Sequence, residues 1–170
     1  MVGVGFPRPI AIEAFAKIER VVGVGLEYGF LPTISVLGAD VSFKGVSADL
    51  RLFPFRGAFF IGARVGRQWL DAQTSVSVAR FGSITETMAA ATWFVNPRIG
   101  FLHTFESGIT LGVDAGIQLP INPTYERDGP ATALGYGNPN NINQTLASVA
   151  GALGNNVTPT FDALRVGFLF

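Results

Sequence analysis

The chain has no cysteine and a single histidine, His103, among its 170 residues. Without cysteine, neither a disulfide nor a thiolate metal site can form. One histidine provides no histidine cluster for zinc, and period-two alternation places His103 on the outward face, away from any buried serine–acid pair. We therefore predict no catalytic, cofactor-binding or metal-binding site, and we expect the protein not to be an enzyme.

An excess of charge of either sign is also missing. Only 14% of the residues are charged, and 12 Lys and Arg balance 12 Asp and Glu. A balanced chain offers no basic surface for nucleic acid, so we expect no nucleic-acid partner. The first residues, Met-Val-Gly-Val-Gly, lack the basic start and the apolar stretch of a secretion signal. Either such a signal has been removed, which we expect, or the chain stays in the cytoplasm.

Long hydrophobic runs are absent although the chain is apolar, with 48% hydrophobic residues and a mean hydropathy of +0.38. The longest uncharged run, 129–161, is rich in Asn, Gly and Pro. It cannot be a helix of about 20 apolar residues that crosses a bilayer. The remaining way for an apolar chain to cross lipid is a closed β-barrel, whose strands satisfy all backbone polar groups. We therefore expect one barrel domain over residues 1–170.

The clearest period-two alternation lies at residues 109–121. One face carries Ile109, Leu111, Val113, Ala115, Ile117, Leu119 and Ile121, and the other carries Thr110, Gly112, Asp114, Gly116, Gln118 and Pro120. This pattern predicts a half-buried strand of about the length that a tilted membrane strand needs. A soluble lipocalin-like carrier would need polar residues outside and apolar residues inside, which is the reverse arrangement.

Similar alternating segments recur at 10–18, 22–30, 46–53, 59–66 and 95–102. The links between them alternate between tight (19–20, 55–57 and 106–108) and long (31–40, 71–87 and 122–159). Short periplasmic turns and long extracellular loops are typical of outer-membrane barrels. Before Ile10 only Val2–Phe6 is available as a strand, and Pro7-Arg8-Pro9 follows it. The two prolines predict either a very tight outer loop or a kink in one long strand over residues 2–18. A short first strand makes the count eight and keeps it even.

The last strand carries the most specific resemblance. Leu164, Val166, Phe168 and Phe170 form one face, and Phe161, Ala163, Arg165, Gly167 and Leu169 form the other. An amphipathic strand that ends the chain on Phe resembles the closing strand of bacterial outer-membrane β-barrels. In that family the terminal aromatic residue lies in the lipid interface and is recognised by the barrel-assembly machinery. By pattern, the whole chain resembles small barrels such as the OmpA membrane domain, OmpX and OmpW.

The resemblance implies an eight-stranded, up-and-down, antiparallel transmembrane β-barrel in the bacterial outer membrane. Its expected partners are the lipid bilayer and the barrel-assembly machinery. The implied function is a non-enzymatic structural or surface-interaction role in the cell envelope. The alternative is a narrow channel or conduit for small, often apolar, solutes.

The face opposite the lipid collects most of the charges. We expect the following residues to point inward: Glu13, Lys17, Glu27, Asp49, Arg51, Arg64, Arg98, Asp114, Gln118 and Arg165. Eight strands enclose a space just wide enough for side chains. Buried charges there must be paired, because an isolated buried ion costs several kcal/mol. We predict a network of salt bridges that fills the lumen, with a narrow polar path as the alternative.

Two further features belong to the ends of the barrel. We expect lipid-facing aromatic residues at both membrane interfaces. Those at the outer interface are Tyr28, Phe30, Trp69 and Trp93, and those at the inner interface are Phe59, Phe101, Phe105, Phe168 and Phe170. In the long outer segment, Leu146, Val149, Ala150 and Leu153 follow helical spacing between Asn143 and Gly154. A short helix there would cover the barrel, lie on the membrane surface or pack on neighbouring loops. The sequence names no partner for this loop.

Overall fold

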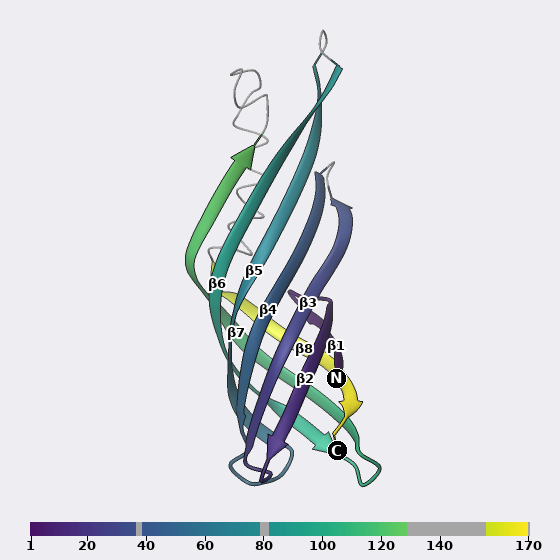
Figure 1. Cartoon of the computed structure of the whole chain (residues 1–170), viewed down its shortest axis with the longest axis vertical. Coiled ribbons are helices and arrows are strands. Elements are labelled where there is room, and N and C mark those ends of the chain that lie inside the picture. Colours follow the sequence, from purple (N-terminus) through teal and green to yellow (C-terminus); the bar gives the residue numbers. More distant parts are fainter. Residues whose placement is uncertain (37–38, 79–81, 129–155, 170) are drawn as a thin grey trace.

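The computed structural model describes residues 1–36, 39–78, 82–128 and 156–169, and these form a closed barrel of eight strands (Figure 1). The strands are β1 (Val2–Phe6), β2 (Ile10–Ile18), β3 (Val22–Val36), β4 (Ala39–Leu52), β5 (Phe59–Val78), β6 (Gly82–Thr104), β7 (Ile109–Asp128) and β8 (Thr158–Phe168). Each strand pairs antiparallel with its neighbours in chain order. The eight-stranded, up-and-down architecture is confirmed. Within the described residues, no helix is long and apolar enough to cross a membrane.

The five-residue strand β1 closes the barrel between β2 and β8. Val2 pairs with Ile12 on one side and with Val166 on the other. The link Pro7-Arg8-Pro9 therefore reverses the chain between two antiparallel strands, and does not kink a single long strand. Proline has no backbone N–H to give to a sheet ladder, which suits it to a link at which both strands end.

Three tight links lie at one end of the barrel, here called the lower end (Figure 1). They connect β2 to β3, β4 to β5, and β6 to β7, as the sequence predicts. In the first of them, Val21 N–H donates to Ile18 C=O at 2.9 Å. Glu19 and Arg20 between these residues have φ of 49° and 61°. Positive φ at both central residues is what a type I′ hairpin turn requires.

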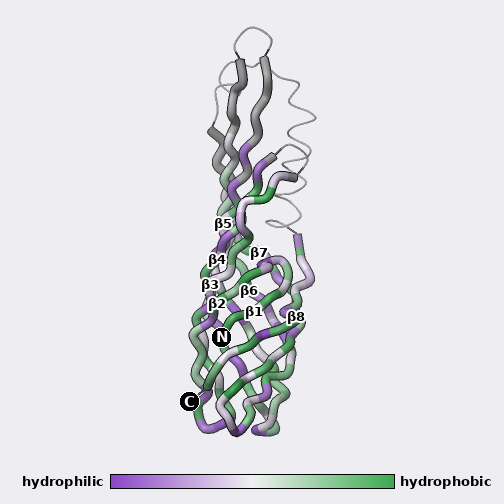
Figure 2. The backbone as a smooth tube through the Cα atoms, turned by 90° about the vertical axis from the view of Figure 1, so that its right-hand side faces the viewer, coloured by the Kyte–Doolittle hydropathy of each residue, from purple (hydrophilic) through white to green (hydrophobic). Residues whose placement is uncertain are grey.

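The strands rise further at the opposite, upper end than the sequence predicts. The predicted long loops 31–40 and 71–87 are wrong, because β3, β4, β5 and β6 continue through most of both segments. The physical reason is an inversion of polarity. Below, Val46 points outward and Asp49 inward. Above, Phe43 and Leu70 point inward and are buried, whereas Lys44 points outward. Hydrophobic residues, green in Figure 2, are spread around the lower barrel.

Strand β7 follows its predicted alternation without an error. Its seven apolar positions from Ile109 to Ile121 are all exposed, and Thr110, Gly112, Asp114 and Gln118 between them are buried. The core of this molecule is therefore the lumen, and the outer surface of the lower barrel is apolar. That is the reverse of a soluble barrel, as the sequence predicts.

Strand β8 departs from its predicted alternation at one point. Asp114 pairs with Asp162 and Gly112 pairs with Arg165, so Ala163 and Leu164 together face Val113. This β-bulge adds one residue and reverses the phase of the strand. Leu164, Val166 and Phe168 point outward as predicted. Phe161 and Ala163, predicted inward, also point outward, and Asp162 points inward with 8% of its surface exposed.

Two sequence predictions fall outside the described residues. These are the position of Phe170 and the loop helix at residues 143–154.

Candidate functional site: the charge network in the lumen

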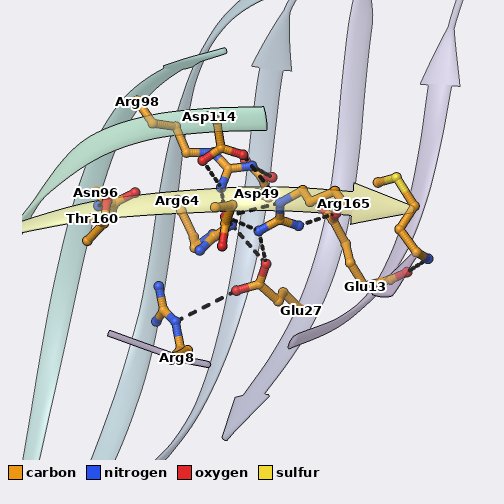
Figure 3. A network of polar contacts seen from close by, with 12 residues as sticks. Arg8, Glu13, Glu27, Asp49, Arg64, Asn96, Arg98, Asp114, Thr160 and Arg165 are labelled. Carbon is orange, nitrogen blue, oxygen red and sulfur yellow. Dashed lines mark hydrogen bonds and ion pairs between the residues drawn. The ribbon is translucent and has the colours of Figure 1, made fainter. Parts of the chain in front are cut away.

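Ten charged side chains of the described residues are buried in the lumen, five of each sign. The arginines are Arg8, Arg51, Arg64, Arg98 and Arg165, and the carboxylates are Glu13, Glu27, Asp49, Asp114 and Asp162. They project from β2, β3, β4, β5, β6, β7, β8 and the β1–β2 link, so almost the whole wall contributes (Figure 3). We call this set the charge network. Its net charge is zero when all ten groups are ionised.

Arg165 on β8 is the most connected member of the charge network. Its Nη1 donates to Glu13 at 2.6 Å and its Nε donates to Asp162 at 3.0 Å. It also forms ion pairs with Glu27 and, at 3.2 Å, with Asp114. Its four partners come from β2, β3, β7 and β8 itself, with only 1% of Arg165 exposed. One guanidinium thus ties together strands that close the barrel (Figure 3).

Arg98 and Arg64 link the remaining carboxylates. Arg98 Nη2 donates to Asp49 at 2.6 Å, and its Nη1 donates to Asp114 at 3.2 Å. Arg64 lies 2.8 Å from Glu27. Three of the arginines that the sequence places inward, Arg64, Arg98 and Arg165, are therefore in contact with Glu27, Asp49 and Asp114. Charged hydrogen bonds of this kind are stronger than neutral ones.

Glycines on the inward face give these long side chains their space. A Cβ on Gly25 would lie 2.7 Å from Glu13 Oε1, and one on Gly116 would lie 2.8 Å from Arg98 Cβ. Both distances are shorter than real Cβ contacts. Larger residues at these positions would push the charged groups out of their pairs, so the inward glycines belong to the site.

Below the charge network the lumen is filled by apolar side chains. Phe53, Phe60 and Leu102 form a buried cluster, against which Met1 and Phe15 pack. We call these five residues the apolar plug. The guanidinium of Arg51 lies 4.4 Å from the Phe15 ring centroid and 5.1 Å from that of Phe60. Cation–π contacts therefore join the charge network to the plug.

Above the charge network lies a layer of neutral polar side chains. Gln118 Nε2 donates to Gln68 Oε1 at 2.9 Å, and Asn96 Nδ2 donates to Thr160 Oγ1 at 2.8 Å. Gln118, predicted to point inward, is buried but belongs to this amide layer and not to the charge network. From bottom to top, the lumen thus holds an apolar plug, a charge network and an amide layer.

Lys17 stands apart from the charge network, although the sequence placed it there. Its Nζ lies 3.7 Å from the Phe53 ring centroid and donates to Gly57 C=O at 3.2 Å. It therefore covers the lower side of the apolar plug. The other charged residues predicted to line the lumen all lie within the charge network.

Sequence reasoning missed two members of the charge network, Asp162 and Arg8. Regular alternation with Leu164 would place Asp162 on the outward face, and nothing in Phe-Asp-Ala-Leu marks the bulge. Arg8 lies in the link between two prolines, where no period applies. Its Nε lies 3.8 Å from Glu27, and its guanidinium lies 4.8 Å from the Phe94 ring centroid. Charge balance gives no signal for them either, because adding one residue of each sign leaves the net charge of the predicted set unchanged.

Among the residues that the structure describes, His103 is not placed to act as a base beside a buried nucleophile. His103 is exposed on the outside of β6, with its ring 4.7 Å from that of Phe105. Each carboxylate of the charge network is beside at least one arginine, which favours a structural role over proton transfer. Within the described part of the chain, no group of three or more His, Asp or Glu residues is placed to hold a metal ion.

Comparison with solved structures gives a likeness in fold. The crystal structure of Acinetobacter baumannii CarO superposes with a TM-score of 0.51 and 13% identity, over 99% of this chain and 95% of that one. The crystal structure of Acinetobacter baumannii CarO2 gives a TM-score of 0.47 and 15% identity, over 98% and 97%. No protein-family model matches the sequence, and no curated protein matches it. At 13% identity, the likeness to CarO concerns the fold alone.

Proposed function

We propose that the protein spans the bacterial outer membrane as a small, closed β-barrel. Support comes first from its outer surface. Leu26, Leu50 and Ile99 are exposed on 65%, 57% and 56% of their surfaces, and similar residues surround the lower barrel. Soluble monomers rarely expose apolar patches larger than a few hundred Å². Lipid would cover this band, and a closed barrel leaves no backbone group unpaired within it.

The height of the band suits a bilayer. Along β5, the outward side chain of Trp69 follows that of Phe59 by ten positions. Ten residues of strand measure about 33 Å, or about 25 Å of height at a tilt of about 40°. Membrane barrels carry an apolar band about 25 Å tall between two aromatic girdles. The tight links then lie on the periplasmic side.

We further propose that the barrel is a non-enzymatic structural or surface-interaction protein of the envelope, with a lumen closed to solutes. The observation that carries this is the burial of the charges. Arg51 and Arg165 are exposed on only 0% and 1% of their surfaces, in a space also occupied by the apolar plug. A conducting pore would leave such groups accessible to water.

The membrane proposal predicts a depth-dependent cost for an outward arginine. Val113→Arg, near the middle of the band on β7, should destabilise the inserted barrel by about 2–4 kcal/mol, and Thr124→Arg, exposed near the upper end of the same strand, by at most about 1 kcal/mol. Urea unfolding from lipid vesicles measures both values. Equal stability of the two variants, or failure of the wild-type protein to float with vesicles, would reject the membrane assignment.

A narrow conduit for small solutes is the second candidate function. It is favoured by buried polar atoms without a hydrogen-bond partner among the described residues, including Asp49 Oδ1, Arg51 Nη1 and Asn96 Oδ1. Buried polar atoms of this kind are usually satisfied by water. Osmotic swelling of vesicles containing the protein separates the two functions. The closed barrel gives no swelling above that of empty vesicles in glycerol, whereas a conduit gives a rate that increases with the amount of protein.

A further inference from the structure

Arg67 on β5 is a cation on the apolar outside of the barrel. Its neighbours in sequence, Gly66 and Gln68, are buried on the inward face, and Arg67 itself is exposed. Its guanidinium lies 5.5 Å from the Trp69 ring and 5.8 Å from the Trp93 ring. Within the described residues, Arg67 has no carboxylate in ion-pair contact. Its partners there are two indole rings.

The position of Arg67 along the strand coincides with the upper border of the apolar band. Ile61 and Val65 lie below it on the outward face, and Asp71 lies above it. Across the sheet, Arg67 pairs with Val46 and Trp93, and Trp69 pairs with Lys44. Arg67 and Lys44 are thus diagonal neighbours on one face. Lys44 lies 3.6 Å from Asp71 in an exposed pair, so the group retains one net positive charge.

A small cavity of about 180 Å³ opens beside these residues. Arg67, Trp69 and Asp71 lie on one wall, and Ala89, Ala91 and Thr124 on the other. Small side chains at Ala89 and Ala91 leave the hollow next to the bulky Trp69. The cavity therefore presents a charged side to an approaching ligand within an apolar and aromatic surround.

We propose that this surface, made by Arg67, Trp69, Trp93 and Lys44, binds the phosphate group of a lipid in the outer leaflet. A guanidinium within cation–π distance of two indoles and without a carboxylate partner among the described residues can offer two N–H groups to two phosphate oxygens. The apolar band directly below accommodates the acyl chains of the same molecule. A soluble anion would gain nothing from that band. The proposal rests on the membrane placement described above.

The lower girdle provides an internal contrast. Phe59 and Phe101 occupy corresponding outward positions on β5 and β6 near the lower end, with rings 5.5 Å apart and in edge contact. No arginine or lysine of the described residues stacks on them. Arg67 is therefore not a general feature of the aromatic girdles, and the phosphate site belongs to one leaflet.

Tryptophan fluorescence tests the proposal directly, because the chain has two tryptophans and both flank Arg67. The folded protein in an uncharged detergent is titrated with phosphatidic acid and, separately, with phosphatidylcholine. We expect a saturable change with phosphatidic acid only. Arg67→Gln should weaken binding roughly fivefold, the factor that corresponds to about 1 kcal/mol per basic residue. The affinity of Arg67→Lys should lie between those of the wild-type protein and Arg67→Gln, because lysine keeps the positive charge but lacks the planar guanidinium.

Arg20→Gln is the matched control, because it removes an exposed arginine at the lower end. It should bind phosphatidic acid as the wild-type protein does. Equal affinity of wild type and Arg67→Gln overturns the proposal, and so does an equal response to phosphatidylcholine. Saturation by inorganic phosphate alone would assign the site to a soluble anion and overturn the lipid as its ligand. Flotation of wild type with vesicles, measured in parallel, shows whether the membrane placement itself has failed.

Discussion

At the scale of single residues, the charge network depends on its balance. Each of the five arginines has at least one carboxylate within ion-pair distance, and Arg165 has four. Such a network adds little stability compared with well-packed apolar side chains. Removing one member is different, because it leaves an unpaired charge where water has little access. Single substitutions in the charge network should therefore reduce the free energy of unfolding more than removal of a complete ion pair does.

Arg98→Met makes this expectation measurable. Arg98 is paired with Asp49, Asp114 and Asp162 at 2.6, 3.2 and 3.4 Å. Its loss should reduce the free energy of unfolding by about 3–5 kcal/mol. Arg56→Met, in an exposed lower turn, should change it by at most about 0.5 kcal/mol. Urea unfolding in lipid vesicles measures both. Adding Asp49→Asn to Arg98→Met should restore part of the loss, and equal stability of the two single variants would contradict the network.

At the scale of elements, the bulge on β8 decides which residues reach the lumen. Asp162 and Arg165 both point inward only because Ala163 and Leu164 share one position opposite Val113. On the other side, Val4 pairs with Leu164 and Gly5 with Asp162, so β1 follows the same irregularity. The bulge thus places two charges of opposite sign, three residues apart, on one face. In a regular strand their side chains would point to opposite faces.

Deleting Ala163 should be tolerated for this reason. Without it, Asp162, Leu164 and Arg165 alternate as in a regular strand, and each keeps its face and its partners on β1 and β7. Deleting Ala115 from the regular part of β7 should prevent folding, because every side chain beyond it would change face. Heat-modifiable migration on a denaturing gel reports the folded barrel. A folded Ala115 deletion together with an unfolded Ala163 deletion would mean that the register is wrong.

At the scale of the whole molecule, the sequence predicts the strands of the barrel better than the contacts between side chains in its lumen. Alternation on β2, β4 and β7 is strong because lipid and lumen sort side chains onto opposite faces. Near Phe43 and Lys44 the apolar side chains change to the inward face and the outward face becomes polar. The predicted strands therefore end too early there. The contact between Glu13 and Arg165 spans 152 positions, so only closure of the barrel brings them together.

The lumen closed by its own charges and by the apolar plug is the central claim, and conductance across a planar lipid bilayer tests it most directly. Protein that has first been confirmed as folded by heat-modifiable migration is inserted and held under voltage. Arg51 and Phe53, which lie where the charge network meets the apolar plug, are both 0% exposed. We expect no steady conductance above that of the bare bilayer. Large, steady openings of the wild-type protein would contradict the closed barrel and establish the conduit instead.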